Sequence, residues 1–134
     1  KKINERKPKT LDDIEDIWYE GYGDNRTAHY NSSRYHLCNL HSFFNGHHTI
    51  ELRAFNSTTH AGEIRSYVAL ALALNQHALT VRSISPKKPV TDNEKFTFRT
   101  FLVRIGLNGE EFANCREHLT KHLTGNSAWR YGRP

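Results

Sequence analysis

The chain has 134 residues, of which 37% are hydrophobic, 25% charged and 11% aromatic, and its formal net charge is +5. This length and balance are typical of one compact globular domain and too small for two. No stretch approaches the ~18 uninterrupted apolar residues of a membrane span, and no apolar run follows the charged start as it would in a signal peptide. We therefore expect a cytoplasmic protein.

The positive charge is concentrated at the start of the chain. Residues 1–10 hold five basic residues against Glu5, a local charge of +4, so the rest of the chain carries +1. Such a run is typical of a solvated start, and a phosphate-binding arm is the alternative. We expect residues 1–10 to be a basic flexible start and residues 11–134 to form a single α+β domain.

A first helix of about three turns is expected after Thr10. Thr10 precedes two carboxylates, as a capping residue does, and apolar residues recur at helical spacing at Leu11, Ile14, Ile17 and Trp18. The helix should end near Gly21. Residues 24–34 are polar without a clear period, so we expect a loop that leads Arg34 into the next strand.

Two segments rich in aromatic and β-branched residues, 35–44 and 48–55, predict a β-hairpin with the three-residue loop 45–47. The resulting register pairs Phe44 with His48, Ser42 with Ile50, Leu40 with Leu52 and Cys38 with Ala54. It places one set of side chains on a buried face (Cys38, Leu40, Ile50 and Leu52) and the other on the opposite face (Asn39, His41, Thr49, Glu51 and Arg53). A two-residue loop would mix polar and apolar residues on both faces, so hydrophobic matching favours the first register.

Three helices are expected after the hairpin. The first opens at residues 58–63 and continues to Leu79, the second is capped by Asp92 and ends at Gly106, and the third runs from 110 to 123. We expect Trp129, in the segment that follows, to be a core anchor. Together these elements predict an α+β fold in which an antiparallel hairpin packs against a bundle of α-helices.

Cysteine and histidine usage does not indicate a metal site. Cys38 and Cys115 are too few for a disulfide framework and are expected to be reduced and buried. None of the nine histidines stands with cysteine or carboxylate partners at a known zinc spacing. His118 and His122 are four apart but lack the intervening Glu of a zinc protease motif, so structural zinc is not expected.

Glu51 and Arg53 are the best candidates for chemistry, because two residues that stand two apart on a strand point in one direction. One interpretation is a solvated sheet face with a charge pair. The other is a site for a phosphorylated ligand, in which Glu51 holds Mg²⁺ and Arg53 contacts phosphate. Arg34, at the mouth of the adjacent strand, would then bind a second anion.

One motif runs through the hairpin and into the next helix: Arg34–Phe44, Gly46, Thr49–Thr58 and His60–Gly62. It resembles the amidoligase family of bacterial mobile elements and phages, which is related to carboxylate-amine ligases with a glutamine synthetase-like or glutamate-cysteine ligase-like fold. The resemblance is specific over this motif and continues weakly into the later helices, so that it covers about residues 15–130. It implies an antiparallel sheet with helices on one side and ATP with Mg²⁺ on the other.

The resemblance also implies roles for single residues. The family's Thr-Ile-Glu-x-Arg strand supplies a metal-binding Glu and a phosphate-binding Arg, which match Glu51 and Arg53. Arg34 and Asn39 match the start and the Asn of the preceding strand and imply contacts with substrate or phosphate. We add His41, on the same predicted face, as a polar contact beside Glu51. The implied reaction joins a carboxylate to an amine, from small molecules or peptides, through an acyl phosphate made from ATP.

One departure from the family pattern affects the expected activity. The family's N-terminal strand with two metal-binding carboxylates has no match here, because Glu15 and Glu20 fall on the first expected helix, and the chain contains no Met. We therefore expect the C-terminal portion of such an enzyme, inactive alone, with the missing N-terminal segment as its partner. Neither a membrane nor nucleic acid is an expected partner.

Two other classes stay open. A nucleic-acid-binding accessory protein of a mobile element would use the basic start with Lys87, Lys88 and the arginines near the C-terminus, and its affinity would fall steeply with salt. A non-catalytic interaction module would not need Glu51 and Arg53 exposed in a cleft. A structure in which these two side chains are buried in a local pair would favour the module.

Overall fold

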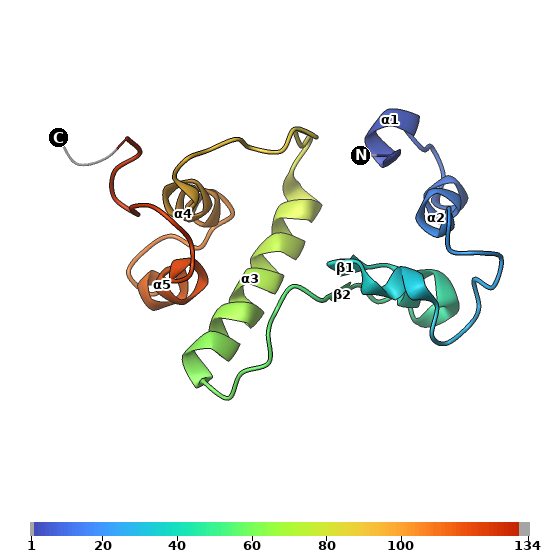
Figure 1. Ribbon diagram of the computed structural model, residues 1–134, viewed down its shortest axis with the longest axis horizontal. Coiled ribbons are helices and arrows are strands. Elements are labelled where there is room, and N and C mark those ends of the chain that lie inside the picture. Colours follow the sequence, from blue (N-terminus) through green and yellow to red (C-terminus); the bar gives the residue numbers. More distant parts are fainter. Residues whose placement is uncertain (1, 132–134) are drawn as a thin grey trace. The chain divides into compact units, whose positions relative to one another are not determined.

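The computed structural model describes residues 2–131 and divides into two compact units, Lys1–Asn56 and Ser57–Pro134 (Figure 1). The first unit contains α1 (Lys2–Arg6), α2 (Leu11–Tyr19), the 3₁₀ turn η1 (Ser32–Tyr35), β1 (Cys38–Asn39), the kinked helical turn η2 (Phe43–His47) and β2 (Glu51–Leu52). The second contains α3 (Ala61–Thr80), α4 (Glu94–Arg104) and α5 (Ala113–Thr120). The α+β class and the antiparallel strand pair are confirmed. The division after Asn56 falls inside residues 11–134, which were expected to form a single domain.

The start of the chain has a defined conformation. Residues 2–6 form α1, and both Lys2 and Arg6 form ion pairs with Glu20, at 2.8 and 2.7 Å. The next helix, α2, begins with the expected cap: Thr10 Oγ1 accepts the backbone N–H of Asp13 at 3.1 Å, and the Asp13 carboxylate accepts that of Thr10 at 3.0 Å. This reciprocal pair satisfies two amides that a helix start leaves open.

The strand pair has a different register from the expected one. Cys38 pairs with Leu52 and Asn39 with Glu51, and the backbone N–H of Arg53 donates to the Leu37 carbonyl at 2.7 Å. The expected pairing of Leu40 with Leu52 is therefore wrong by two residues. A slip of two residues preserves the alternation of side chains, but the burial of the two faces differs from the expected one. Ile50, expected on the buried face, is 58% exposed, whereas Asn39 and His41 of the opposite face are 2% and 6% exposed.

The strands are also much shorter than the expected segments 35–44 and 48–55. The carbonyl of Leu40 accepts the N–H groups of both Phe43 and Phe44, at 3.0 and 3.2 Å, so the chain turns into a helical conformation directly after β1. Asn39 Oδ1 accepts the N–H of His41 at 2.8 Å. In a longer strand, the N–H of His41 could donate to the neighbouring strand. Here it donates to the Asn39 side chain instead, which explains why the strand pair ends.

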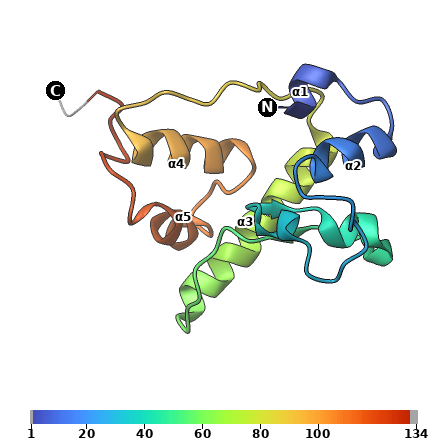
Figure 2. The same cartoon turned by 45° about the vertical axis from the view of Figure 1, so that its right-hand side comes forward.

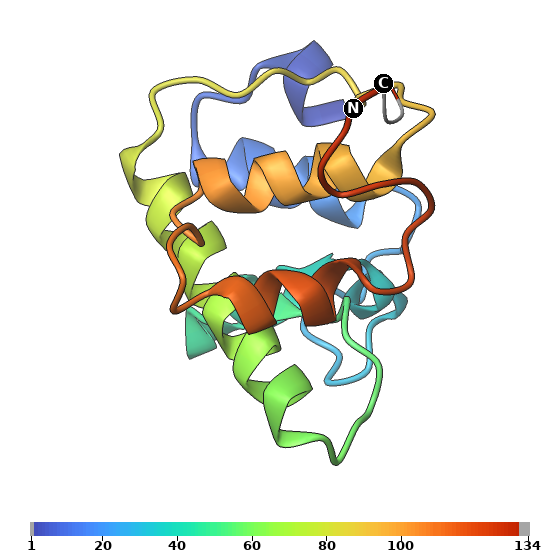
Figure 3. The same ribbon diagram turned by 90° about the vertical axis from the view of Figure 1, so that its left-hand side faces the viewer.

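In the second unit, α5 packs against α3 and α4 (Figures 2 and 3). The core between these helices is small and includes the fully buried Leu102 and the buried Leu70, Ile105, Leu107 and Cys115. Cys115 is thus buried as expected, whereas Cys38 of the first unit is half-buried. Within residues 2–131, no helix combines the length and apolarity that a membrane crossing requires.

The cap of α4 is Asn93 and not the expected Asp92. Asn93 Oδ1 accepts the N–H groups of Phe96 and Asn126 at 3.0 and 3.1 Å, and its amide donates to the Trp129 carbonyl at 2.8 Å. One buried side chain thereby caps a helix and anchors the C-terminal segment. The Trp129 side chain is 45% exposed, so the expected core anchor is wrong. Gly106, with φ +101°, ends α4 as expected.

Candidate active site

A cavity of about 300 Å³ lies within the first unit, beside the strand pair. Nine residues line it: Thr27, His29, Arg34, Asn39, His41, Ser42, Asn45, His47 and Glu51. Four of the five site residues expected from the sequence are among them. The fifth, Arg53, is not a lining residue but lies next to Glu51.

Glu51 is fixed across the strand pair by Asn39. The Asn39 amide donates to Glu51 Oε2 at 2.7 Å, and Asn39 is itself only 2% exposed. The buried amide cannot reorient freely, because its carbonyl oxygen accepts the backbone N–H of His41. Asn39 therefore holds the carboxylate at the wall of the cavity.

Arg53 forms an ion pair with Glu51 on the same face of the strand. Its guanidinium lies 3.0 Å from Glu51 Oε1 and 5.5 Å from the centre of the Tyr35 ring. The two side chains are 46% and 30% exposed for Glu51 and Arg53, so the pair is at the surface. The buried local pair that would favour a non-catalytic module is not what the structure shows.

The surroundings of Glu51 keep its carboxylate ionised. Its pKa is lowered from the ordinary value first by the hydrogen bond from Asn39, and further by the positive charges of Arg53 and Arg34, which outweigh partial desolvation. Each of its oxygens already accepts one hydrogen bond. A carboxylate has about four lone-pair positions, so it can still bind a cation.

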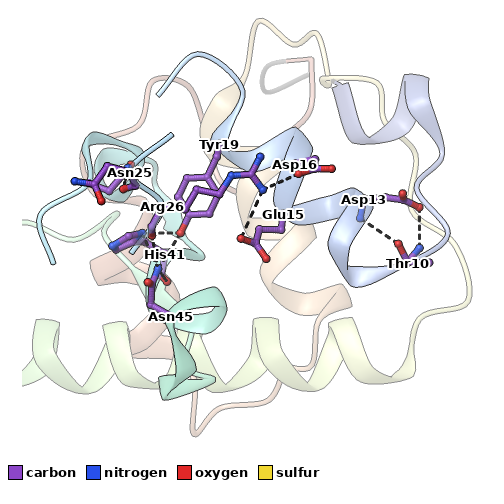
Figure 4. Close-up of polar contacts among 10 residues, drawn as sticks. Thr10, Asp13, Glu15, Asp16, Tyr19, Asn25, Arg26, His41 and Asn45 are labelled. Atoms are coloured by element: carbon purple, nitrogen blue, oxygen red, sulfur yellow. Dashed lines mark hydrogen bonds and ion pairs between the residues drawn. The ribbon is translucent and has the colours of Figure 1, made fainter. Parts of the chain in front are cut away.

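His41 is held by hydrogen bonds at both ring nitrogens, and Figure 4 shows its contact with Tyr19. Nε2 donates to the Ala28 carbonyl at 2.8 Å, since a carbonyl can only accept, and Nδ1 accepts the hydroxyl of Tyr19 at 2.7 Å. The residue is only 6% exposed. The structure therefore places His41 at the cavity wall, where its ring ties the loop before η1 to α2.

Tyr19 and Asn45 complete this network, and the sequence analysis missed both. The Asn45 amide lies 3.0 Å from the Tyr19 hydroxyl and 2.9 Å from the Arg26 carbonyl (Figure 4). Tyr19 is 2% exposed, and burial raises the pKa of its phenol. No local pattern marks these residues, because Tyr19 stands 22 positions before His41.

Acidic residues in and directly after α2 form ion pairs outside the cavity lining. Arg26 lies 2.6 Å from Asp16 and 3.7 Å from Glu15, with its guanidinium 5.4 Å from the centre of the Tyr19 ring (Figure 4). Glu20 holds the basic start. Glu15 and Glu20 thus follow the expectation that they lie at this helix and not on a metal-binding strand.

Arg34 reaches the cavity from η1 rather than from a strand. Its guanidinium is 5.2 Å from the centre of the Tyr30 ring and 6.0 Å from that of Tyr35. His29, His47 and Ser42 were not expected at the site, and they add ring nitrogens and a hydroxyl to its lining.

The donor set fits a phosphorylated ligand with a hard cation. Glu51 is the one carboxylate among the described lining residues, and it faces a wall with one guanidinium and several neutral donors. Hard cations such as Mg²⁺ take oxygen ligands, and guanidinium groups bind phosphate. The volume is at the lower end of the ~300–1,000 Å³ found for small-molecule sites, so part of a nucleotide fits this cavity.

Comparisons with known proteins bear on the segment that holds this cavity. The model of a family described as a putative amidoligase enzyme matches residues 1–75, more than half of the 134-residue chain. Neither the curated proteins nor the solved structures yield a match. The match includes every residue that lines the cavity and supports a ligase-type enzyme. The chain therefore belongs to the family of putative amidoligase enzymes.

Proposed function

We propose that the protein is an ATP-dependent carboxylate-amine ligase whose nucleotide phosphates occupy the cavity beside β1 and β2. The observation that carries this proposal is the convergence of Glu51, Asn39 and Arg34 on one cavity inside the family-matched segment. A carboxylate and a guanidinium that line the same small polar cavity can together hold a phosphate group and its metal ion.

The residues divide the work by their chemistry. Glu51 offers an oriented, ionised oxygen to Mg²⁺, and Asn39 holds it in place. Arg34 contacts phosphate oxygens from the cavity wall. Arg53, which pairs with Glu51, would contact the same oxygens when the cation shares the Glu51 carboxylate. When bound, Mg²⁺ offsets the negative charge of the phosphates. One protein carboxylate is few for this ion, so we propose that phosphate oxygens, water and a further protein segment supply the remaining ligands.

The proposed reaction has two transfers. A substrate carboxylate oxygen attacks the γ-phosphorus of ATP, and ADP leaves, which gives an acyl phosphate. The amine nitrogen then attacks the acyl carbon, phosphate leaves, and the nitrogen loses a proton. The chain's contribution is positioning and charge neutralisation. In the complete enzyme, Glu51→Gln or Arg53→Ala should lower the rate on the order of 10²-fold or more, as removal of a preorganised charged group does.

A nucleic-acid-binding role has less support. Two cations of the basic start, Lys2 and Arg6, form ion pairs with Glu20, and these pairs reduce the charge that this segment offers to a phosphate backbone. The cavity that the family match covers is instead suited to a small ligand.

Titration of the isotope-labelled chain with Mg-ATP, followed by NMR, tests the proposed function. We expect shifts centred on residues that line the cavity, and at least about tenfold weaker binding in Glu51→Gln and Arg34→Ala, one lost ionic contact each. Glu117→Gln, in the second unit, is the control and should bind as the wild type does. Shifts confined to the basic cavity of the second unit, lined by Lys95, Arg99 and Arg116, would contradict the proposal, and so would the absence of shifts.

A further inference from the structure

Two histidines and a glutamate converge in the second unit, whereas the cavity described above belongs to the first. His60 caps α3, Glu63 lies in the first turn of that helix, and His118 lies on α5. One ligand atom from each lies within 4.8 Å of the other two, and the centres of the two imidazole rings are 5.0 Å apart. No local sequence pattern predicts this cluster, because its third member, His118, lies on another helix.

Gly62 is what allows the two rings to approach each other. A Cβ at this position would lie 2.6 Å from His118 Nε2 and 3.0 Å from His60 Cε1. The first distance is too short for unbonded atoms and the second is tighter than an ordinary contact, so a side chain at position 62 would displace the His118 ring. The lack of a side chain at Gly62 therefore lets both imidazoles lie against the start of the helix.

The carboxylate of Glu63 is ionised and held from two sides. The Lys121 ammonium and the Thr58 hydroxyl both bind it, and these contacts, with Lys121 first, lower the pKa of Glu63 to about 2. Lys121 contacts Oε1. A carboxylate can accept further contacts at its other oxygen. Lys121 therefore competes with a metal ion for the Glu63 carboxylate but does not prevent the ion from binding.

The histidine ligands are also available. His60 Nδ1 accepts the backbone N–H of Glu63 over a long 3.3 Å contact at an exposed position. A neutral imidazole that ligates a metal through one nitrogen carries its proton on the other, so metal binding through either nitrogen would end this contact. The N–H of Glu63 then becomes a reporter of metal binding.

Space for an additional ligand lies beside the cluster. A cavity of about 140 Å³ is lined by Gly62, His118, Arg65, Glu111 and other residues of α3 and α5. Two histidines and one carboxylate, with one position open to water, form a common set of zinc ligands in proteins.

We propose that His60, Glu63 and His118 form a binding site for a zinc-class transition metal, with a fourth, non-protein ligand. Imidazole nitrogen favours such ions over Mg²⁺, which selects oxygen. The bound ion would tie the start of α3 to α5 and so stabilise the second unit. The site is separate from the Glu51 cavity and does not depend on the proposed ligase function.

Titration of the untagged, metal-free full chain with Co²⁺, and Zn²⁺ competition against it, tests the site. We expect one equivalent of Co²⁺ with the intense visible absorption of a four-coordinate site, displaced by Zn²⁺ and not by excess Mg²⁺. His60→Ala and His118→Ala should each weaken binding at least about tenfold, as the loss of a ligand does. The matched controls His122→Ala and His77→Ala should bind normally.

Lys121→Met provides a test in the opposite direction. Removal of the competing ammonium frees the Glu63 carboxylate, so this variant should bind Co²⁺ more tightly than the wild type, whereas Glu63→Gln should bind more weakly. Circular dichroism establishes that each variant is folded. In the wild type, Zn²⁺ should shift the Glu63 amide resonance and raise the melting temperature. Full Co²⁺ affinity in the folded Glu63→Gln and His118→Ala variants would overturn the proposal, as would no saturable binding to the wild type.

Discussion

The side-chain amide of Asn39 lies 2.7 Å from Oε2 of Glu51, across the two-residue strand pair. Asn39 is 2% exposed and Glu51 faces the cavity, so a buried neutral group orients a charged one. This relationship depends on the observed register, because Asn39 and Glu51 are directly opposite only in that pairing.

Asn39→Ala is expected to raise the pKa of Glu51 towards its ordinary value, because the largest cause of its lowering is the Asn39 hydrogen bond. A carboxyl with a lowered pKa stabilises the fold above its unfolded-state pKa, and this contribution is lost as the pH falls through the folded-state value. Carbon NMR of the Glu51 carboxyl during a pH titration measures the change. Ser42→Ala, also at the cavity wall, should leave the Glu51 pKa where it is, and an unchanged pKa in Asn39→Ala would refute the assignment.

Tyr19→Phe is expected to lower the free energy of unfolding by about 1–3 kcal/mol, because it removes two buried hydrogen bonds, one to His41 and one to Asn45, each of which contributes about 0.5–1.5 kcal/mol. Tyr22→Phe is the matched control. The Tyr22 hydroxyl makes an equivalent 2.8 Å contact with His36, but at the surface, so its loss should cost about 0.5 kcal/mol or less. Urea unfolding of both variants makes the comparison, and equal losses would show that burial of the network is not decisive.

Asp13→Asn should destabilise the chain more than Asp12→Asn, although both remove one negative charge from the first turn of α2. Only Asp13 accepts the backbone N–H groups of Lys9 and Thr10, at 2.9 and 3.0 Å, and these bonds lower its pKa. The stabilisation is therefore present above the unfolded-chain value of ~3.9 and is lost in more acid solution. Unfolding curves at neutral and acid pH should show a gap between the variants that closes in acid. A constant gap would exclude ionisation as its cause.

Leu102→Ala should lower the free energy of unfolding by about 2–5 kcal/mol, because this side chain is fully buried between α4 and its neighbours and its truncation leaves a cavity. Leu79→Ala is the matched control on α3. Leu79 is 76% exposed, so its truncation should change stability by about 0.5 kcal/mol or less. Chemical unfolding followed by circular dichroism measures both, and a similar effect of the two changes would show that the core does not centre on Leu102.

Features that depend only on neighbouring residues could be predicted from the sequence. The capping box at Thr10, the end of α4 at Gly106 and the long helix α3 follow from local hydrogen bonds and backbone preferences. That Asn39 and Glu51 share a face was also predictable, because a register error of two residues preserves the alternation of side chains. The burial of the two faces was not, since Asn39 and His41 are buried and Ile50 is exposed. The predicted gathering of Asn39, Arg34 and Glu51 at one place rested on that alternation and on the family motif.

The length of the strands and the contacts between residues far apart in the chain depend on the tertiary structure. The length of the strands was set by the Asn39 side chain and the turn at Leu40, which compete with the ladder in a way that strand propensity does not reveal. The bonds of His41 to Tyr19, and the approach of His118 to His60, join residues far apart in the chain. Such contacts leave no periodic signal in the sequence, because they depend on how whole elements pack and not on the spacing of residues within one element.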